Sequence, residues 1–326
     1  MINIGLIGCG FVSYYYCQSA CNHSNICLKG VYDRNAYKSK ELADKYNCKK
    51  YDTFDDLLND CELIINATNP NEHFELNKKI LSAGKHLYSE KPICLSLEQF
   101  EELLNLSLKK NVKILSAPAT YLSNAFTCLK DNLHKIGKVR SIKAQMTEKN
   151  VPYHKISNPL GRKWNIHDEF KTGCNLEHAG YMLAILLSLF NGDITNLNVR
   201  KGVAKYAKEL GDKIYCVSTP DIYKSNFLLD DINVTMTTSI VNDENRMINI
   251  YGDNGVLELR DVWDFNSPIY LNGEEISYEN EHFKNDWELN IDLCRPIHVF
   301  EKDEKKVMDI MIIKKMLSLM LEIQDA

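Results

Sequence analysis

Residues 2–13 read INIGLIGCGFVS and hold the pattern that decides the fold. The apolar run of residues 2–7 predicts a buried strand, and Gly8 and Gly10 follow it directly before an aromatic segment that can open a helix. A strand, a glycine-rich turn and a helix N-terminus bind pyrophosphate, because glycines let the backbone approach and the helix offers free N–H groups. Ser13 replaces the third glycine of the G-x-G-x-x-G pattern, and such a glycine pair is also compatible with a simple tight turn.

A second predicted strand, residues 28–33, ends in an acidic residue at the spacing this pattern requires. The Asp33 carboxylate there can accept hydrogen bonds from both hydroxyls of an adenosine ribose. It would also repel a 2′-phosphate, which favours NAD over NADP. Arg34 works the other way, since a guanidinium can stack on adenine or pair with that phosphate, so NADP is not excluded. Asp33 is also compatible with a helix cap or a turn.

The composition is that of a soluble globular protein with room for two domains. The chain has 326 residues, of which 44% are hydrophobic and 25% charged, and its formal net charge is −5. That charge gives no reason to expect nucleic acid or an anionic membrane as a partner. The 11 cysteines form no zinc-type spacing, so we expect no metal site, reduced thiols and a cytoplasmic protein without an export signal. The longest apolar run, residues 181–190, predicts a core helix because it is too short to span a membrane.

Strands and helices alternate regularly up to about residue 117. Further strands are predicted at residues 61–67, 86–89 and 112–117, with amphipathic segments between them. This alternation predicts an α/β fold with a doubly wound parallel sheet, whose ligand crevice lies at the carboxyl ends of the strands. Polar or turn-forming residues occupy those ends, namely Gly8, Asp33, Thr68 and Glu90.

The pattern changes near residue 120, where we place the boundary between a dinucleotide-binding domain (1–120) and an α+β domain (121–326). Residues 152–171 predict a polar loop and residues 174–190 an apolar helix. The strand-like runs beyond them follow one another without helices, which predicts an open, mostly antiparallel sheet. Helices at about residues 283–299 and 305–322 close the chain, and the last one can pack back on the first domain.

Several of these motifs together resemble the Gfo/Idh/MocA family of NAD(P)-dependent oxidoreductases. They are Gly8-Cys9-Gly10, Asp33-Arg34, Thr68-Asn69-Pro70 with His73, Glu90-Lys91-Pro92 and Gly137-Lys138-Val139. The resemblance implies a Rossmann domain followed by an open-sheet domain, hydride transfer to or from sugars, nucleotide-sugars or polyols, and a homodimer or homotetramer formed through the C-terminal sheet. The cofactor contacts that motifs and resemblance together predict are Gly8, Gly10, Phe11, Val12, Asp33, Arg34, Thr68, Asn69, Pro70, His73, Glu90 and Lys91.

The resemblance also implies the catalytic residues. Lys91 matches the family's lysine, which meets the substrate oxygen beside the nicotinamide. In the second signature, residues 172–181, Glu177 matches an aspartate and Tyr181 matches a histidine. Their spacing of four puts them on one helix face, so Lys91 and Tyr181 would share the proton transfer while Glu177 orients the substrate. His178 is the other candidate for the acid/base, and both His178 and Tyr181 are also compatible with simple core packing.

The remaining predicted contacts concern the substrate. Arg162 and Lys163 suit a phosphate or carboxylate, Trp164 lies beside them, and Tyr121 follows the last Rossmann strand. The run around Arg162 is also compatible with a solvated loop. Because the second signature departs from the family pattern, two functions stay open: an active oxidoreductase, or a sensor or regulatory protein that binds NAD(H) on the same fold.

Overall fold

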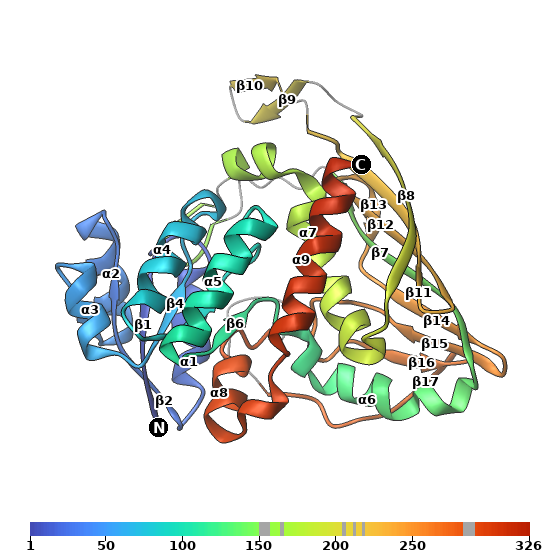
Figure 1. Ribbon diagram of the computed structural model, residues 1–326, viewed down its shortest axis with the longest axis horizontal. Coiled ribbons are helices and arrows are strands. Elements are labelled where there is room, and N and C mark those ends of the chain that lie inside the picture. Colours follow the sequence, from blue (N-terminus) through green and yellow to red (C-terminus); the bar gives the residue numbers. More distant parts are fainter. Residues whose placement is uncertain (150–156, 164–165, 204–206, 211–212, 217–218, 283–290) are drawn as a thin grey trace.

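A six-stranded parallel sheet organises the N-terminal part of the computed structural model (Figure 1). The structure describes residues 1–149, 157–163, 166–203, 207–210, 213–216, 219–282 and 291–326. The strands lie in the order β3-β2-β1-β4-β5-β6. Their bounds are β1 Ile2–Ile7, β2 Ile26–Tyr32, β3 Lys49–Lys50, β4 Leu63–Asn66, β5 His86–Ser89 and β6 Ile114–Ser116. The order reverses between β1 and β4, and this switch point is where doubly wound sheets bind their ligands.

Five helices cover the two faces of this sheet. They are α1 Ser13–Cys21, α2 Ala36–Tyr46, α3 Phe54–Asp60, α4 Pro70–Ser82 and α5 Leu97–Lys110. Strand residues alternate between the faces: Ile4 and Leu6 pack with α1 and α2, whereas Ile7 packs with α3, α4 and α5. A Cβ at Gly5 would come within 2.8 Å of Leu57, so glycine lets α3 lie close to β1. The predicted parallel sheet is confirmed.

The second sheet has nine strands and is mostly antiparallel, as predicted. Their order is β17-β16-β15-β14-β7-β12-β11-β8, with β13 paired to β7, and only β7 and β12 run parallel. The bounds are β7 Val139–Lys149, β8 Ile194–Gly202, β11 Ile222–Leu229, β12 Ile232–Ser239, β13 Val241–Asn245, β14 Ile248–Gly252, β15 Gly255–Leu259, β16 Ile269–Leu271 and β17 Glu274–Glu275. The strands β9 (Ala207–Leu210) and β10 (Lys213–Cys216) form a separate hairpin.

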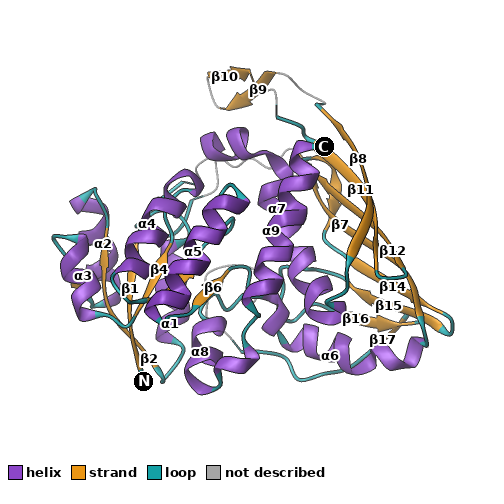
Figure 2. Cartoon of the chain, viewed as in Figure 1, coloured by secondary structure: helices purple, strands orange, loops and turns teal. Residues whose placement is uncertain are grey.

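In Figure 2, α7 Ile166–Phe190 and α9 Ile310–Asp325 lie between the two sheets. The other helices of this part are α6 Asn124–Asn132 and α8 Arg295–Lys302, with 3₁₀ turns at Thr120–Leu122, Leu133–Ile136 and Glu304–Lys306. Helix α9 contacts both α7 and α5, and the Asn175 amide ties α7 to the main-chain oxygen of Met320 at 2.8 Å. One apolar core therefore runs from α5 through α9 and α7 to the second sheet. Helix α8 packs near α1 instead.

Two local predictions differ from the structure. Helix α7 begins at Ile166, inside the predicted loop, and a non-helical Gly173 (φ 79°, ψ 161°) interrupts it. Residues 166–172 are mostly polar and show no sustained apolar repeat of helical spacing, so the sequence predicts a loop there. The short strands β3, β13, β16 and β17 were not predicted, since strands of two to five residues carry little periodicity. Parts of the predicted loop 152–171 and helix 283–299 lie outside the described residues.

Candidate active site

The glycine turn after β1 has the geometry that a dinucleotide requires. Gly8 has φ +87°, and a Cβ there would lie 2.8 Å from the backbone of Ala67, so only glycine lets β1 and β4 end side by side. Gly10 faces open space, with nothing within 4 Å of where its Cβ would be. Helix α1 begins after Val12 without a side-chain cap, so its first N–H groups are available to an anion. These features fit a bound pyrophosphate.

The end of β2 places Asp33 against this turn. Its two carboxylate oxygens accept one N–H each, from Cys9 at 2.7 Å and from Asn35 at 2.7 Å. Asn35 in turn caps α2. Asp33 therefore stabilises the turn before α2, and this role is compatible with a contact between its carboxylate and a ribose. Arg34 is exposed and lies 3.7 Å from Glu72. The predicted contacts of Asp33 and Arg34 with a cofactor stay predictions.

A buried amide network holds the ends of β4 and β5 together. Asn66 accepts hydrogen bonds from Thr68 and donates to Asn77 at 2.8 Å, and Asn77 donates to Ser89 at 3.0 Å. The bonded amides fix the entry to α4, where the predicted contacts Thr68, Asn69 and Pro70 lie, Pro70 being the first residue of that helix. Sequence reasoning missed this network because its members lie in different elements.

His73 supports this segment from inside the protein. Its ring is fully buried, and its two nitrogens lie 2.7 Å from the Pro92 carbonyl and 2.9 Å from the Thr68 carbonyl. Burial lowers the pKa of His73, although the two carbonyls oppose this effect. The residue therefore links the loop after β4 to the Lys91-Pro92 segment after β5, and its predicted contact with a cofactor stays a prediction.

The Glu90 carboxylate is held on both oxygens. It accepts the Tyr16 hydroxyl at 2.7 Å and the Lys91 N–H at 3.0 Å. Tyr16 lies on α1, directly behind the glycine turn, and burial raises the pKa of its hydroxyl. This contact joins α1, the helix that follows β1, to the end of β5, and β4 lies between β1 and β5 in the sheet.

Lys91 and Glu177 form a buried ion pair between the first sheet and α7. The Lys91 ammonium donates to the Glu177 carboxylate at 2.6 Å and to its main-chain oxygen at 2.9 Å. The two side chains are only 10% and 9% exposed. Burial alone would lower the pKa of Lys91, but Glu177 and neighbouring groups raise it above the usual lysine value. Lys91 therefore stays an ammonium at neutral pH.

Tyr181 lies next to this ion pair. The Lys91 ammonium is 5.6 Å from the centroid of the Tyr181 ring, and the Trp263 ring packs edge-on against it at 5.7 Å. Burial raises the pKa of Tyr181 to about 12, while the charge of Lys91 opposes the increase. Tyr181 is only partly buried. Its hydroxyl is therefore protonated at neutral pH and can donate a proton.

His178 lies deeper than Tyr181. It is 4% exposed, its Nε2 is 3.9 Å from Glu148, and its Nδ1 is buried without a hydrogen-bond partner. Burial and the charge of Lys91 lower the pKa of His178 to about 4, so the ring is neutral at pH 7. Arg246 lies 3.9 Å from Glu148 and 4.7 Å from the centre of the Trp263 ring. Glu148, Arg246 and Trp263 were not predicted at this site from the sequence, because no local pattern links them to α7.

The predicted substrate contacts are not gathered at one place. Tyr121 is 6% exposed, and its hydroxyl accepts the N–H of Met308. Arg162 forms an ion pair with Glu41 on α2, and Lys163 is exposed. Trp164 lies outside the described residues. The structure thus brings Lys91, Glu177, His178 and Tyr181 together and places Arg162 near α2; their roles stay predictions.

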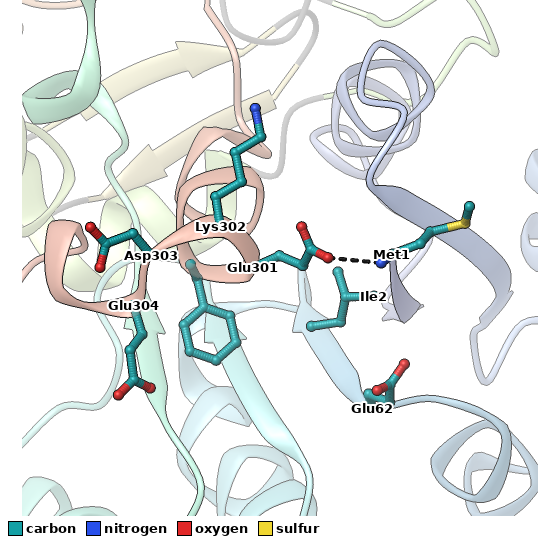
Figure 3. A pocket seen from close by; sticks show the side chains of 8 residues that line it. Met1, Ile2, Glu62, Glu301, Lys302, Asp303 and Glu304 are labelled. Atoms are coloured by element: carbon teal, nitrogen blue, oxygen red, sulfur yellow. Dashed lines mark hydrogen bonds and ion pairs between the residues drawn. The ribbon is translucent and has the colours of Figure 1, made fainter.

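A surface hollow of about 480 Å³ lies at the amino end of β1, away from the strand ends that carry these residues (Figure 3). It is lined by Met1, Ile2, Glu62, Phe300, Glu301, Lys302, Asp303 and Glu304, and the terminal amine bonds Glu301 at 2.7 Å. None of the described helices is long and apolar enough to cross a membrane. Within the described ranges, no three His, Cys, Asp or Glu residues are grouped so that they could hold a metal.

Comparison with known proteins identifies the family of the chain. Residues 2–117 match the model of an oxidoreductase family with an NAD-binding Rossmann fold, and residues 130–308 match the C-terminal alpha/beta domain of that family. The chain belongs to the Gfo/Idh/MocA oxidoreductase family. Its N-terminal part is therefore an NAD(P)-binding Rossmann domain.

Relatives with assigned activities are similar over part of their length. The chain is 30% identical over 158 residues to the scyllo-inositol 2-dehydrogenase (NADP(+)) IolU of Bacillus subtilis, covering 47% of this chain and 48% of that one. It is 26% identical over 220 residues to a glucose-6-phosphate 3-dehydrogenase of the same species, covering 65% and 61%. Both matches span less than two thirds of the relative. The solved UDP-N-acetylglucosamine 3-dehydrogenase of Acidithiobacillus ferrooxidans shares the fold, with a TM-score of 0.77 and 18% identity over 100% of this chain and 97% of that one.

Proposed function

We propose that the chain is an NAD(P)-dependent dehydrogenase or reductase acting on the CH–OH group of a sugar, nucleotide-sugar or polyol. The observation that carries this proposal is the buried Lys91 ammonium, which extends from the end of β5 to Glu177 on α7. A cationic donor beside the nicotinamide end of a dinucleotide crevice can stabilise the negative oxygen formed in hydride transfer. The family membership and the named sugar and inositol dehydrogenases among its relatives support the same reaction.

The cofactor would be held by the glycine turn, the end of β2 and the loop after β4. Open space at Gly10 and the uncapped start of α1 suit its pyrophosphate, and Asp33 suits its adenosine ribose. When bound, the nicotinamide supplies or accepts the hydride.

Lys91 acts as a hydrogen-bond donor to the substrate oxygen. Its bonds to Glu177 use two of its three N–H groups, which leaves one for the substrate. Because the pKa of Lys91 is raised, it contributes mainly charge, and the proton moves elsewhere. Glu177 holds the ammonium in position and orients substrate hydroxyls.

Tyr181 exchanges the proton with the substrate oxygen. It is nearer to solvent than His178, and its hydroxyl is protonated at neutral pH, as carbonyl reduction requires. His178 is the second candidate: its neutral ring can accept a proton during alcohol oxidation, although its Nδ1 is buried. Replacing each in turn distinguishes them, since only loss of the true proton donor lowers turnover with a matched substrate.

The test is a panel of free sugars, inositols, sugar phosphates and nucleotide-sugars, incubated with purified protein and NAD(H) or NADP(H). We expect a change in the 340 nm absorbance of the nicotinamide with at least one member. A protein that binds the dinucleotide tightly but turns over no panel member would contradict the enzyme proposal. That result would instead support the sensor alternative.

We further propose a cytoplasmic homodimer or homotetramer that associates through the second sheet, with its two domains divided near residue 120. The support is the family resemblance and an open sheet whose edge strand β8 has only exposed and partly buried residues. Light scattering on the purified protein measures the assembly, and a monomer at micromolar concentration would contradict it.

A further inference from the structure

A loop from beyond the Rossmann strands is fastened to the glycine turn. The Asn158 side chain is 3% exposed and donates to the Phe11 carbonyl at 2.9 Å. Its amide oxygen accepts the N–H groups of Leu160 and Arg162 at 3.0 Å each. One buried amide therefore shapes the loop 157–163 and ties it to the backbone beside which the pyrophosphate would lie.

This loop carries Arg162 to the first turns of α2. The guanidinium pairs with Glu41 and lies 5.9 Å from the centroid of the Tyr37 ring, while the Tyr37 hydroxyl donates to Glu41 at 3.0 Å. The Arg162 side chain is only 14% exposed. Helix α2 begins three residues after Asp33, so Arg162 stands at the adenosine end of the crevice, far along the dinucleotide from Lys91.

Basic side chains as well as Asp33 lie near the glycine turn. Burial and Asp33 raise the pKa of the Cys9 thiol, whereas Arg162 and Lys38 lower it, so all three charges act on the glycine turn. Arg34 follows Asp33 directly and is exposed, 3.7 Å from Glu72, so it adds a third cation near the end of β2. The two oxygens of Asp33 also accept backbone N–H groups, which spread its charge.

We propose that Arg162 is a cofactor-binding residue that contacts the 2′-phosphate of NADP(H), so that the chain accepts NADP(H) as well as NAD(H). The inference rests on the proposed function. It also gives Arg162 a role at the cofactor in place of the substrate contact predicted from the sequence. A guanidinium has five N–H donors, and the bond to Glu41 uses one, so a phosphate oxygen can be bound without breaking that ion pair.

The test is fluorescence titration of the full chain with NADPH and with NADH, which measures binding without turnover. We expect Arg162→Met to weaken NADPH binding about tenfold or more and NADH binding less than about twofold. Lys40→Met is the matched control, because it removes the same charge from an exposed residue of α2 that pairs with Asp44, and we expect it to leave both affinities within about twofold. Arg162→Lys keeps the charge but loses the planar fork, so we expect an intermediate loss for NADPH.

Four outcomes would overturn the inference. An equal loss of NADH and NADPH affinity in Arg162→Met would show that Arg162 holds the loop 157–163 in place and does not bind the phosphate. Unchanged NADPH affinity in a folded Arg162→Met or Arg162→Lys would remove it from the site. Wild-type protein that binds NADH but not NADPH would refute the inference alone, whereas failure to bind either dinucleotide would refute the proposed function as well.

Discussion

Replacing Glu177 with glutamine keeps the shape of the side chain but leaves the Lys91 ammonium without a carboxylate. The two side chains are 10% and 9% exposed and 2.6 Å apart, so water cannot replace the missing charge. Breaking a buried pair by removing one partner costs about 3–5 kcal/mol. We expect Glu177→Gln to lower the free energy of unfolding by that amount, because it leaves the Lys91 ammonium buried without its carboxylate. We expect Lys91→Met to lower it as well, because the Glu177 carboxylate loses the ammonium that it accepts from.

The double variant separates pairing from packing. Lys91→Met/Glu177→Gln contains no unpaired charge, so we expect it to be more stable than the sum of the single losses predicts, by about 2 kcal/mol or more. Urea unfolding followed by tryptophan fluorescence measures all three proteins. The exposed pair Lys40–Asp44 has the same separation of 2.6 Å with 66% and 65% exposure, so Lys40→Met and Asp44→Asn should each cost less than about 1 kcal/mol. The stabilising role of the ion pair would be refuted if Lys91→Met and Glu177→Gln lowered the free energy of unfolding as little as these two surface variants do. It would also be refuted if the loss in the double variant equalled the sum of the two single losses.

Three further predictions follow from the geometry. Tyr181→Phe should keep dinucleotide affinity but lower turnover about 10²-fold, and unchanged absorbance kinetics would exclude Tyr181 as the proton donor. The pKa of His178 is lowered to about 4 against about 6.5 in the unfolded chain. The unfolded chain therefore takes up a proton first, and stability should fall by about 3 kcal/mol from pH 6.5 to 4. His178→Gln should lessen this fall in urea titrations, and an identical profile would contradict it. Gly8→Ala should destabilise the protein, because φ is +87° and Ala67 is 2.8 Å from the new Cβ. A Cβ at Gly10 would meet nothing within 4 Å, so Gly10→Ala should weaken only dinucleotide binding. An equal fall in melting temperature for Gly8→Ala and Gly10→Ala would contradict this distinction.

The parallel sheet and the site around its strand ends were predictable from local patterns. Each buried strand is an apolar run that ends in a turn residue, and parallel strands necessarily bring those ends to one edge. The predicted range of β1, Ile2–Ile7, agrees with the structure, as does that of β5, His86–Ser89. The family motif added Lys91 and Glu177, which are 86 positions apart and which no local pattern could have joined.

The rest depends on tertiary contacts. Tyr16 reads as a core aromatic in the sequence, yet its hydroxyl holds Glu90. Asn66 and Asn77 are ordinary polar residues until β4 and α4 bring them into one buried network. Arg162 was assigned to a substrate loop because nothing in its sequence neighbourhood indicates that Asn158 anchors that loop to the glycine turn. The position of the loop is set by this distant hydrogen bond rather than by periodicity.

The most direct measurement of the central claim compares Lys91→Met with wild type, using the substrate found in the panel. Nicotinamide absorbance gives the turnover, and fluorescence titration gives the dinucleotide affinity of the same samples. The account predicts that turnover in Lys91→Met falls about 10²-fold or more, while dinucleotide affinity stays within about twofold of wild type. Weak dinucleotide binding with undiminished turnover would contradict the role of the Lys91 ammonium at the reacting oxygen.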